Sequence, residues 1–94
     1  MKDEILKNKF RIEDHIQWVV NANHIVILDG KSKSKFTIHY PEAAIWDLLT
    51  RTSDLTMIIE KMSIITKSMG MNQVEEETVK TIRSWQTQKL IKKI

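Results

Sequence analysis

The three histidines, His15, His24 and His39, carry the side chains in this sequence that are best suited to bind a metal or transfer a proton near neutral pH. His24 and His39 fall in stretches that we expect to be neighbouring strands, which would bring two imidazoles together. Metal sites normally need three or four protein ligands, and no third candidate has a suitable spacing. The chain has no cysteine, which excludes disulfides, zinc–thiolate centres and thiol catalysis. We therefore predict no metal site and no cofactor.

Sequence motifs for catalysis are also missing. Gly30 and Gly70 are the only glycines, so no glycine-rich loop can cradle a phosphate. Neither a nucleophile motif nor a paired-carboxylate pattern is present. A chain of 94 residues forms one small domain, which has little room for a deep substrate cleft beside its core. We predict a binding module and not an enzyme.

The composition is that of a small globular protein. Hydrophobic residues make up 41% of the chain and charged residues 29%, which is too apolar for a disordered protein. The 15 basic and 12 acidic side chains leave a charge of +3, which permits nucleic-acid binding without requiring it. The longest unbroken apolar runs, Ile25–Leu28 and Ala43–Trp46, have four residues, whereas a membrane span needs about 20. We expect a soluble, cytoplasmic protein without a membrane partner.

The first half of the chain has the composition of strands. Residues 1–14 show no clear period, and we interpret them as a lead-in segment before a domain of residues 15–94. Strands are predicted at residues 16–20, 24–28 and 36–40, separated by turns rich in Asn, Asp, Gly and Ser. They form an antiparallel meander whose third strand has a free outer edge, with lysines before it as protection against unwanted pairing.

The second half has the periodicity of three helices. Pro41 opens the first helix, which ends after Leu49. The second begins at an N-cap within residues 52–54, carries an apolar stripe as far as Met69, and ends at Gly70.

The third helix begins with a capping box at residues 72–75. Its apolar side is predicted to carry Val79, Ile82, Trp85 and Leu90. The order of elements predicts an α+β fold of winged helix-turn-helix type, a three-stranded antiparallel sheet followed by three helices. The three tryptophans fall in different elements and are expected in or near the core: Trp18, Trp46 and Trp85.

A winged-helix DNA-binding regulator is one interpretation of this architecture. The third helix, however, opens with Glu75–Glu77, which places three negative charges where a phosphate would lie. The basic turn Lys31–Lys35 is the only wing-like patch. These charges disfavour nucleic acid as a partner, and DNA binding is kept as the alternative function.

The free edge of the third strand is a second feature that can bind a partner. Its unpaired amides and carbonyls can pair with a guest strand, and a flanking pocket then supplies specificity. Val79, Ile82 and Trp85 can line such a pocket if the third helix packs beside the strand. An edge that is merely protected, without a ligand, is the other interpretation left open by periodicity alone.

Several blocks of the sequence follow one family pattern. They are the aliphatic strand Ile25–Leu28, the block Ala43–Leu49 (Ala-Ala-Ile-Trp-Asp-Leu-Leu), the helix opening Thr52–Leu55, and the closing residues Thr78, Val79, Ile82, Leu90 and Ile91. In these blocks the chain resembles the PqqD-like domains, the recognition elements for precursors of ribosomally synthesised, modified peptides. It departs from the pattern at His39–Tyr40, where Leu-Asn is usual, and at Thr78, where an acidic residue is usual. It also lacks the closing Gly-Trp of the pyrroloquinoline-quinone proteins, which favours a free-standing element of another pathway, such as lasso-peptide maturation.

The resemblance implies a function in peptide recognition. PqqD-like domains are not catalysts; they bind the leader segment of a precursor peptide and present it to a maturation enzyme such as a leader peptidase, cyclase or radical SAM enzyme. The leader pairs as an extra strand along the third strand and lies in the groove between that strand and the third helix. The implied contact residues are Lys35, Phe36, Thr37, Ile38 and His39 on the strand, and Thr78, Val79, Ile82, Arg83, Trp85 and Gln86 on the helix.

Three consequences of this assignment are testable. Lys35 and Arg83 are expected to favour a leader with acidic residues beside its apolar anchors. Ile82→Glu is expected to abolish binding without unfolding the domain. Proline at Thr37 or His39 is expected to weaken binding if the lost donor faces outward.

Overall fold

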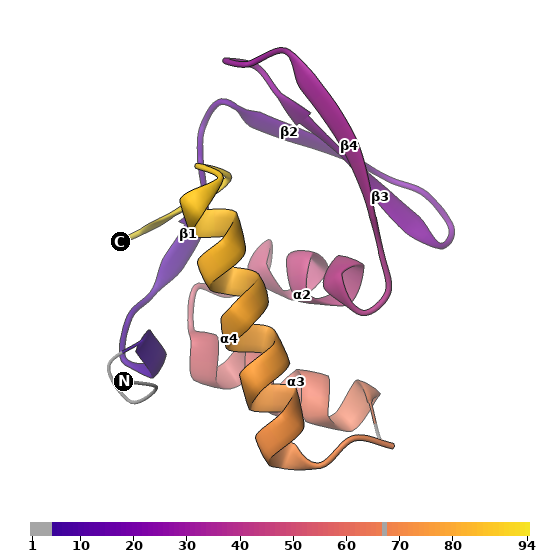
Figure 1. Ribbon diagram of the computed structural model, residues 1–94, viewed down its shortest axis with the longest axis vertical. Helices are drawn as coiled ribbons and strands as arrows, with labels where there is room; N and C mark the ends of the chain where they lie inside the picture. The colour runs from indigo at the N-terminus through magenta and orange to yellow at the C-terminus, as the bar shows by residue number, and fades with distance from the viewer. Residues whose placement is uncertain (1–4, 67) are drawn as a thin grey trace.

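The computed structural model describes residues 5–66 and 68–94 and has an α+β fold (Figure 1). The elements in chain order are β1 (Phe10–Ile12), β2 (Ile16–Val20), β3 (His24–Asp29), β4 (Ser34–His39), α2 (Glu42–Leu49), α3 (Leu55–Ile65), α4 (Met71–Thr87) and β5 (Ile91–Lys93). The predicted class, a three-stranded antiparallel sheet followed by three helices, is confirmed. No helix within the described residues is long and apolar enough to cross a membrane.

The main sheet has the strand order β2-β3-β4, with both pairs antiparallel. The register places Trp18 opposite Ile27 and Ile27 opposite Phe36, so these three side chains share one face of the sheet. Ile27 is fully buried on that face, which packs towards the helices. Strand β4 begins at Ser34 and ends at His39, so it lies slightly earlier in the chain than predicted.

A second, two-stranded sheet joins the two ends of the described chain. Phe10–Ile12 pairs antiparallel with Ile91–Lys93, and Phe10 is 2% exposed in the core. The expected lead-in segment at residues 1–14 therefore contains a strand, and its first four residues lie outside the described part of the chain. The domain boundary at residues 14 and 15 stays a prediction.

Helix α4 is shorter than predicted at its C-terminal end. Lys89 adopts a positive φ of 66°, and the N–H of Leu90 donates to the carbonyl of Trp85 at 2.9 Å. This hydrogen bond closes the helix as in a Schellman motif and turns the chain into β5. Leu90 is buried as predicted, but it lies after the helix and not on its apolar side.

The N-cap predicted for α3 is confirmed, whereas the N-terminus predicted for α4 is not. The Asp54 carboxylate accepts hydrogen bonds from the N–H groups of Thr56 and Met57, as its N-cap role predicts. The capping box predicted at residues 72–75 is wrong, because α4 already begins at Met71 with Gly70 as its N-cap. Gly70 has extended backbone angles, φ −71° and ψ 155°, so it starts α4 and does not end α3.

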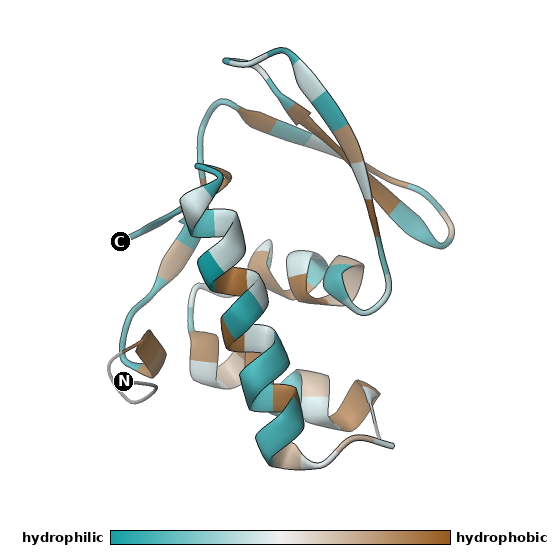
Figure 2. Ribbon diagram, viewed as in Figure 1, coloured by the Kyte–Doolittle hydropathy of each residue, from teal (hydrophilic) through white to brown (hydrophobic). Residues whose placement is uncertain are grey.

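Three tryptophans connect the sheet to the helices. The ring of Trp46 in α2 is fully buried and contacts Trp18 of β2 and Trp85 of α4, in both cases edge to face. Trp85 is buried as well, and Trp18 is 37% exposed. In Figure 2 the visible surface of α4 is mostly hydrophilic, as expected for a helix whose apolar side is turned inward. Packing of this kind sets the position of β4 relative to α4.

Candidate functional site

The outer edge of β4 is free of strand partners among the described residues. Hydrogen bonds at both ends of β3 reveal which backbone groups point to that edge. The N–H of Asn21 donates to the carbonyl of His24 at 2.9 Å, and the N–H of Gly30 donates to the carbonyl of His15 at 2.8 Å. Because pairs alternate along an antiparallel ladder, the even-numbered residues of β3 bond to β2.

The odd-numbered residues of β3 consequently bond to β4. Ile25 and Ile27 face Ile38 and Phe36 in this register, so Phe36 and Ile38 direct their backbone groups towards β3. The alternate residues of β4 direct their N–H and C=O groups outward: Lys35, Thr37 and His39. Their backbone groups form a template for one additional strand.

The side chains of β4 divide in the same way. Phe36 and Ile38 are half-buried and pack against the core, while the side chains of Lys35, Thr37 and His39 are exposed. The contact of Phe36 and Ile38 with a peptide, which the family resemblance implies, stays a prediction. A partner on this edge would meet mainly backbone.

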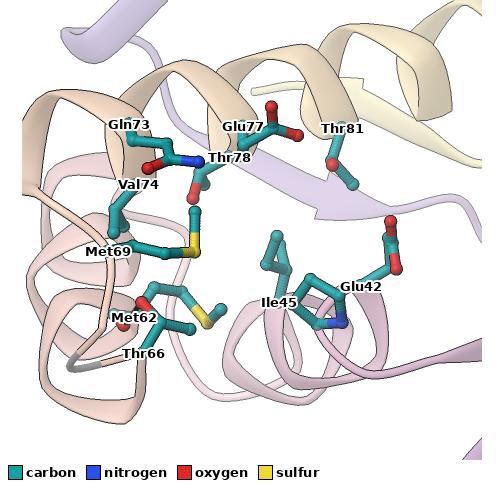
Figure 3. Close-up of a pocket in the computed structure, with 11 residues that line it drawn as sticks. Glu42, Ile45, Met62, Thr66, Met69, Gln73, Val74, Glu77, Thr78 and Thr81 are labelled. Atoms are coloured by element: carbon teal, nitrogen blue, oxygen red, sulfur yellow. Dashed lines mark hydrogen bonds between the residues drawn. The ribbon is translucent and has the colours of Figure 1, made fainter.

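A cavity of about 130 Å³ lies directly beyond the end of β4 (Figure 3). It is enclosed by the start of α2, the C-terminal end of α3 and the N-terminal half of α4. The lining residues are Pro41, Glu42, Ile45, Met62, Thr66, Met69, Gln73, Val74, Glu77, Thr78 and Thr81. Pro41 and Glu42 follow β4 after a single residue, Tyr40, so the cavity lies next to the point where the strand ends.

The cavity can hold one apolar side chain. Its interior is formed by Ile45, Met62, Met69 and Val74. An engineered cavity of about 150 Å³ with a similar apolar lining binds benzene, so the volume suits a branched aliphatic or aromatic group. Two methionines in the lining add adaptability, because their flexible thioethers follow the shape of a ligand.

The structure brings only part of the predicted helix residues to this site. Thr78 lines the cavity, whereas Val79, Ile82 and Trp85 are buried in the core and do not line it. Arg83 lies five positions after Thr78, which corresponds to about 140° around a helix of 3.6 residues per turn.

Gln86 follows Arg83 on the same exposed flank of α4, and neither residue lines the cavity. The cavity-lining residues that sequence reasoning missed on α4 are Gln73, Val74, Glu77 and Thr81. Their spacing of three and four residues marks one helix face, but that face is mostly polar and resembles ordinary solvated surface.

Strand β2 forms the other edge of the sheet. Trp18 and Val20 are 37% and 62% exposed, and by the same alternation their backbone groups point outward. The hollow beside this edge is lined only by residues of β2 and β3, with no helix wall. A further hollow, at the end of β2, is bordered by Val20, by the turn between β2 and β3, and by Ala43 and Ala44 of α2.

The charges around β4 differ between its two ends. Lys33 lies in the turn before the strand and Lys35 at its start, whereas Glu42 and Glu77 lie at the cavity.

Asp29 lies in the turn before β4. Burial raises the pKa of its carboxyl group, but hydrogen bonds from the N–H groups of Ser32 and Lys31 contribute to holding that pKa below its ordinary value of 3.8.

The predicted pairing of His24 and His39 is confirmed, with ring centroids 5.7 Å apart. The His24 ring also lies 3.0 Å from both the amide nitrogen of Asn21 and the amide oxygen of Asn23. Within residues 5–66 and 68–94, no three His, Asp or Glu side chains are grouped so that they could hold a metal ion.

Comparison with known proteins reveals similarity in structure rather than in sequence. No family model matches the sequence, and no curated protein matches it. One solved structure, TbiB1 in complex with the TbiA(beta) leader peptide, superposes with a TM-score of 0.82 at 18% sequence identity. The match covers 87% of this chain and 94% of the TbiB1 chain.

The chain has the fold of TbiB1. This likeness confirms the fold that the sequence resemblance implied. The winged-helix likeness that was also expected has no such support and stays a prediction.

Proposed function

We propose that this protein binds the leader segment of a ribosomally synthesised precursor peptide by adding it as a strand to β4. The observation that carries the proposal is a free strand edge whose strand ends beside an apolar cavity. The fold is shared with TbiB1, whose solved structure contains a leader peptide.

The geometry suits an extended guest chain. Three residues, Lys35, Thr37 and His39, offer outward backbone donors and acceptors, and a paired peptide satisfies them without any requirement on its side chains. Alternate side chains of such a peptide face the helices. One of them, at the end of β4, enters the cavity and supplies specificity.

The bound peptide is then presented to a maturation enzyme. A leader held by its backbone on one side of a small domain leaves the core segment of the precursor outside the domain and accessible to an enzyme. The enzyme is a leader peptidase, cyclase or radical SAM enzyme, and the sequence features favour a pathway such as lasso-peptide maturation. In this proposal the protein itself is a binding partner and performs no chemistry.

The proposal can be tested with the isolated protein. A phage-displayed library of random twelve-residue peptides is selected on the immobilised chain, and the tightest binder is named here the selected peptide. Isotope-labelled protein is then titrated with the selected peptide and, separately, with a random DNA duplex. We expect peptide-induced amide shifts in residues 34–42 and in residues 73–81 of α4, and none of comparable size with DNA.

Two results would contradict the proposal. Failure of the library to yield any binder above background would exclude peptide capture as the function. Shifts induced by the duplex on α4 and on the turn at residues 31–35 would instead support the winged-helix DNA-binding alternative.

A further inference from the structure

Among the residues that the structure describes, two carboxylates are the only charged groups that line the cavity. Glu42 is the first residue of α2, and Glu77 projects from α4 (Figure 3). Both side chains are exposed, and neither forms an ion pair within residues 5–66 and 68–94. An apolar ligand alone brings no counter-charge to these two carboxylates, and no basic side chain of the described residues lines the cavity.

A threonine hydroxyl on the cavity wall has no hydrogen-bond partner among the described residues. Thr78 is 1% exposed, and its hydroxyl forms no hydrogen bond with the other described residues. Its side chain is turned towards the space between α4 and the other two helices. Thr66, by comparison, is 6% exposed and donates its hydroxyl to the carbonyl of Met62. Within the described residues, the indole nitrogen of Trp46 is the only fully buried side-chain nitrogen or oxygen without a partner, so the Thr78 hydroxyl keeps some contact with the open space of the cavity. A ligand that fills this space removes that contact, and a polar group of the ligand can replace it.

We propose that the cavity selects peptides in which an apolar anchor residue is accompanied by a lysine or arginine two positions away. This inference rests on the proposed function, because it names the class of peptide that the same site takes. Side chains two positions apart in an extended chain share a face, so the base lies beside the anchor at the cavity mouth. There it meets Glu42 and Glu77, while a main-chain amide next to the anchor reaches the Thr78 hydroxyl.

The opposite end of the strand has the opposite preference. Lys33 and Lys35 are exposed at the start of β4 and favour an acidic residue in the guest strand. The expectation of acidic residues beside the anchors depended on Lys35 and Arg83 together, and Arg83 does not line the cavity. The resulting specificity is a guest strand that is basic at the cavity end and acidic at the turn end.

The test compares peptide selections on three proteins. The random library is selected on the wild type, on the Glu42→Gln/Glu77→Gln variant, and on the control Glu60→Gln/Glu75→Gln, which removes two carboxylates from α3 and α4 outside the cavity. On the wild type and the control, we expect Lys or Arg to be enriched about 5-fold or more two positions from an apolar residue. On the Glu42→Gln/Glu77→Gln variant, the apolar preference persists and the basic enrichment disappears.

The selected peptide then gives a quantitative check. Replacing its basic residue by glutamine is expected to raise the Kd about 5-fold for the wild type at low salt, and less than 2-fold for the Glu42→Gln/Glu77→Gln variant. The inference is overturned if the wild type enriches apolar anchors without a neighbouring Lys or Arg. It is also overturned if the Lys or Arg enrichment remains on the Glu42→Gln/Glu77→Gln variant. Either result leaves the proposed function intact. A library that yields no binder overturns both.

Discussion

The indole of Trp46 meets the indole of Trp85 edge to face, with ring centroids 5.1 Å apart and 81° between the planes. Trp46 makes a second contact of this kind with Trp18, at 5.9 Å and 76°. The three rings connect β2, α2 and α4 in one chain of contacts. Because β4 is held to β3 and β2, these contacts also determine where the free edge lies relative to the cavity wall on α4.

Removal of the central ring is expected to cost most of the stability of this small domain. Trp46→Ala should lower the free energy of unfolding by about 3–5 kcal/mol, because Trp46 is fully buried. Trp18→Ala should cost only about 1–2 kcal/mol, since Trp18 is 37% exposed. Urea denaturation of both variants measures the difference, and equal losses would contradict the central role of Trp46.

Proline substitution separates the two edges of the sheet. Thr37→Pro removes an outward donor from β4, and Val20→Pro removes an outward donor from β2. We expect Thr37→Pro to weaken binding of the selected peptide about 10-fold, which corresponds to one lost hydrogen bond of about 1.4 kcal/mol. Val20→Pro should leave the Kd within about 2-fold. The Kd of each variant is measured by calorimetry. If Val20→Pro weakens binding and Thr37→Pro does not, the guest strand lies on β2.

Neighbouring positions on α4 have opposite roles. Ile82 is fully buried, so Ile82→Glu would place an unpaired charge in the core and is expected to unfold the domain, contrary to the expectation from the sequence. Thr81 is half-buried and lines the cavity. Thr81→Trp should narrow the cavity mouth and weaken binding of the selected peptide at least about 10-fold. It should change the free energy of unfolding by less than about 1 kcal/mol. Binding that survives Thr81→Trp would show that the cavity is not the anchor site.

The C-terminal end of α4 offers a stabilising substitution. Lys89 has a φ of 66°, a left-handed conformation that costs a residue with a side chain about 1 kcal/mol and costs glycine little. Lys89→Gly is therefore expected to raise the free energy of unfolding by about 0.5–1 kcal/mol. The control Lys80→Gly, at an exposed position inside the same helix, should lower it by about 1 kcal/mol. Thermal or urea unfolding of both variants gives the comparison.

The lowered pKa of Asp29, in the turn before β4, predicts that the free energy of unfolding falls in acid. Its carboxylate accepts hydrogen bonds from the N–H groups of Lys31 and Ser32 at 2.9 and 3.2 Å. Because its pKa is lowered in the folded protein, the contribution to stability is present above the ordinary value of 3.8 and is lost as pH falls through the folded value.

Asp29→Asn should consequently destabilise the protein at pH 7, and the difference from wild type should shrink in strong acid, at about pH 2. Urea unfolding at the two pH values measures this difference. A difference that is constant with pH would show that the charge of Asp29 does not stabilise the turn.

Local sequence determined most of the elements. The β-branched runs of β2 and β3, the alternation at Phe36 and Ile38, and the apolar stripe from Leu55 to Met62 are patterns of single elements, and the structure confirms them. Asp54 was identifiable as a cap because its carboxylate bonds only to the next few residues. Each of these interactions lies within a few residues along the chain.

Tertiary packing determined two features that hydrophobic periodicity could not predict: the pairing of β1 with β5, and the side of α4 that borders the cavity. Phe10–Ile12 becomes a strand because Ile91–Lys93 lies beside it, a contact between the two ends of the chain that no local pattern reports. The side of α4 that borders the cavity depends on how the helix is rotated against Trp46 and Ile45, so Thr81 and Glu77 replace Arg83 and Gln86 there. A helical stripe shows which side is apolar, whereas the neighbours of its polar flanks are determined only when the whole core packs.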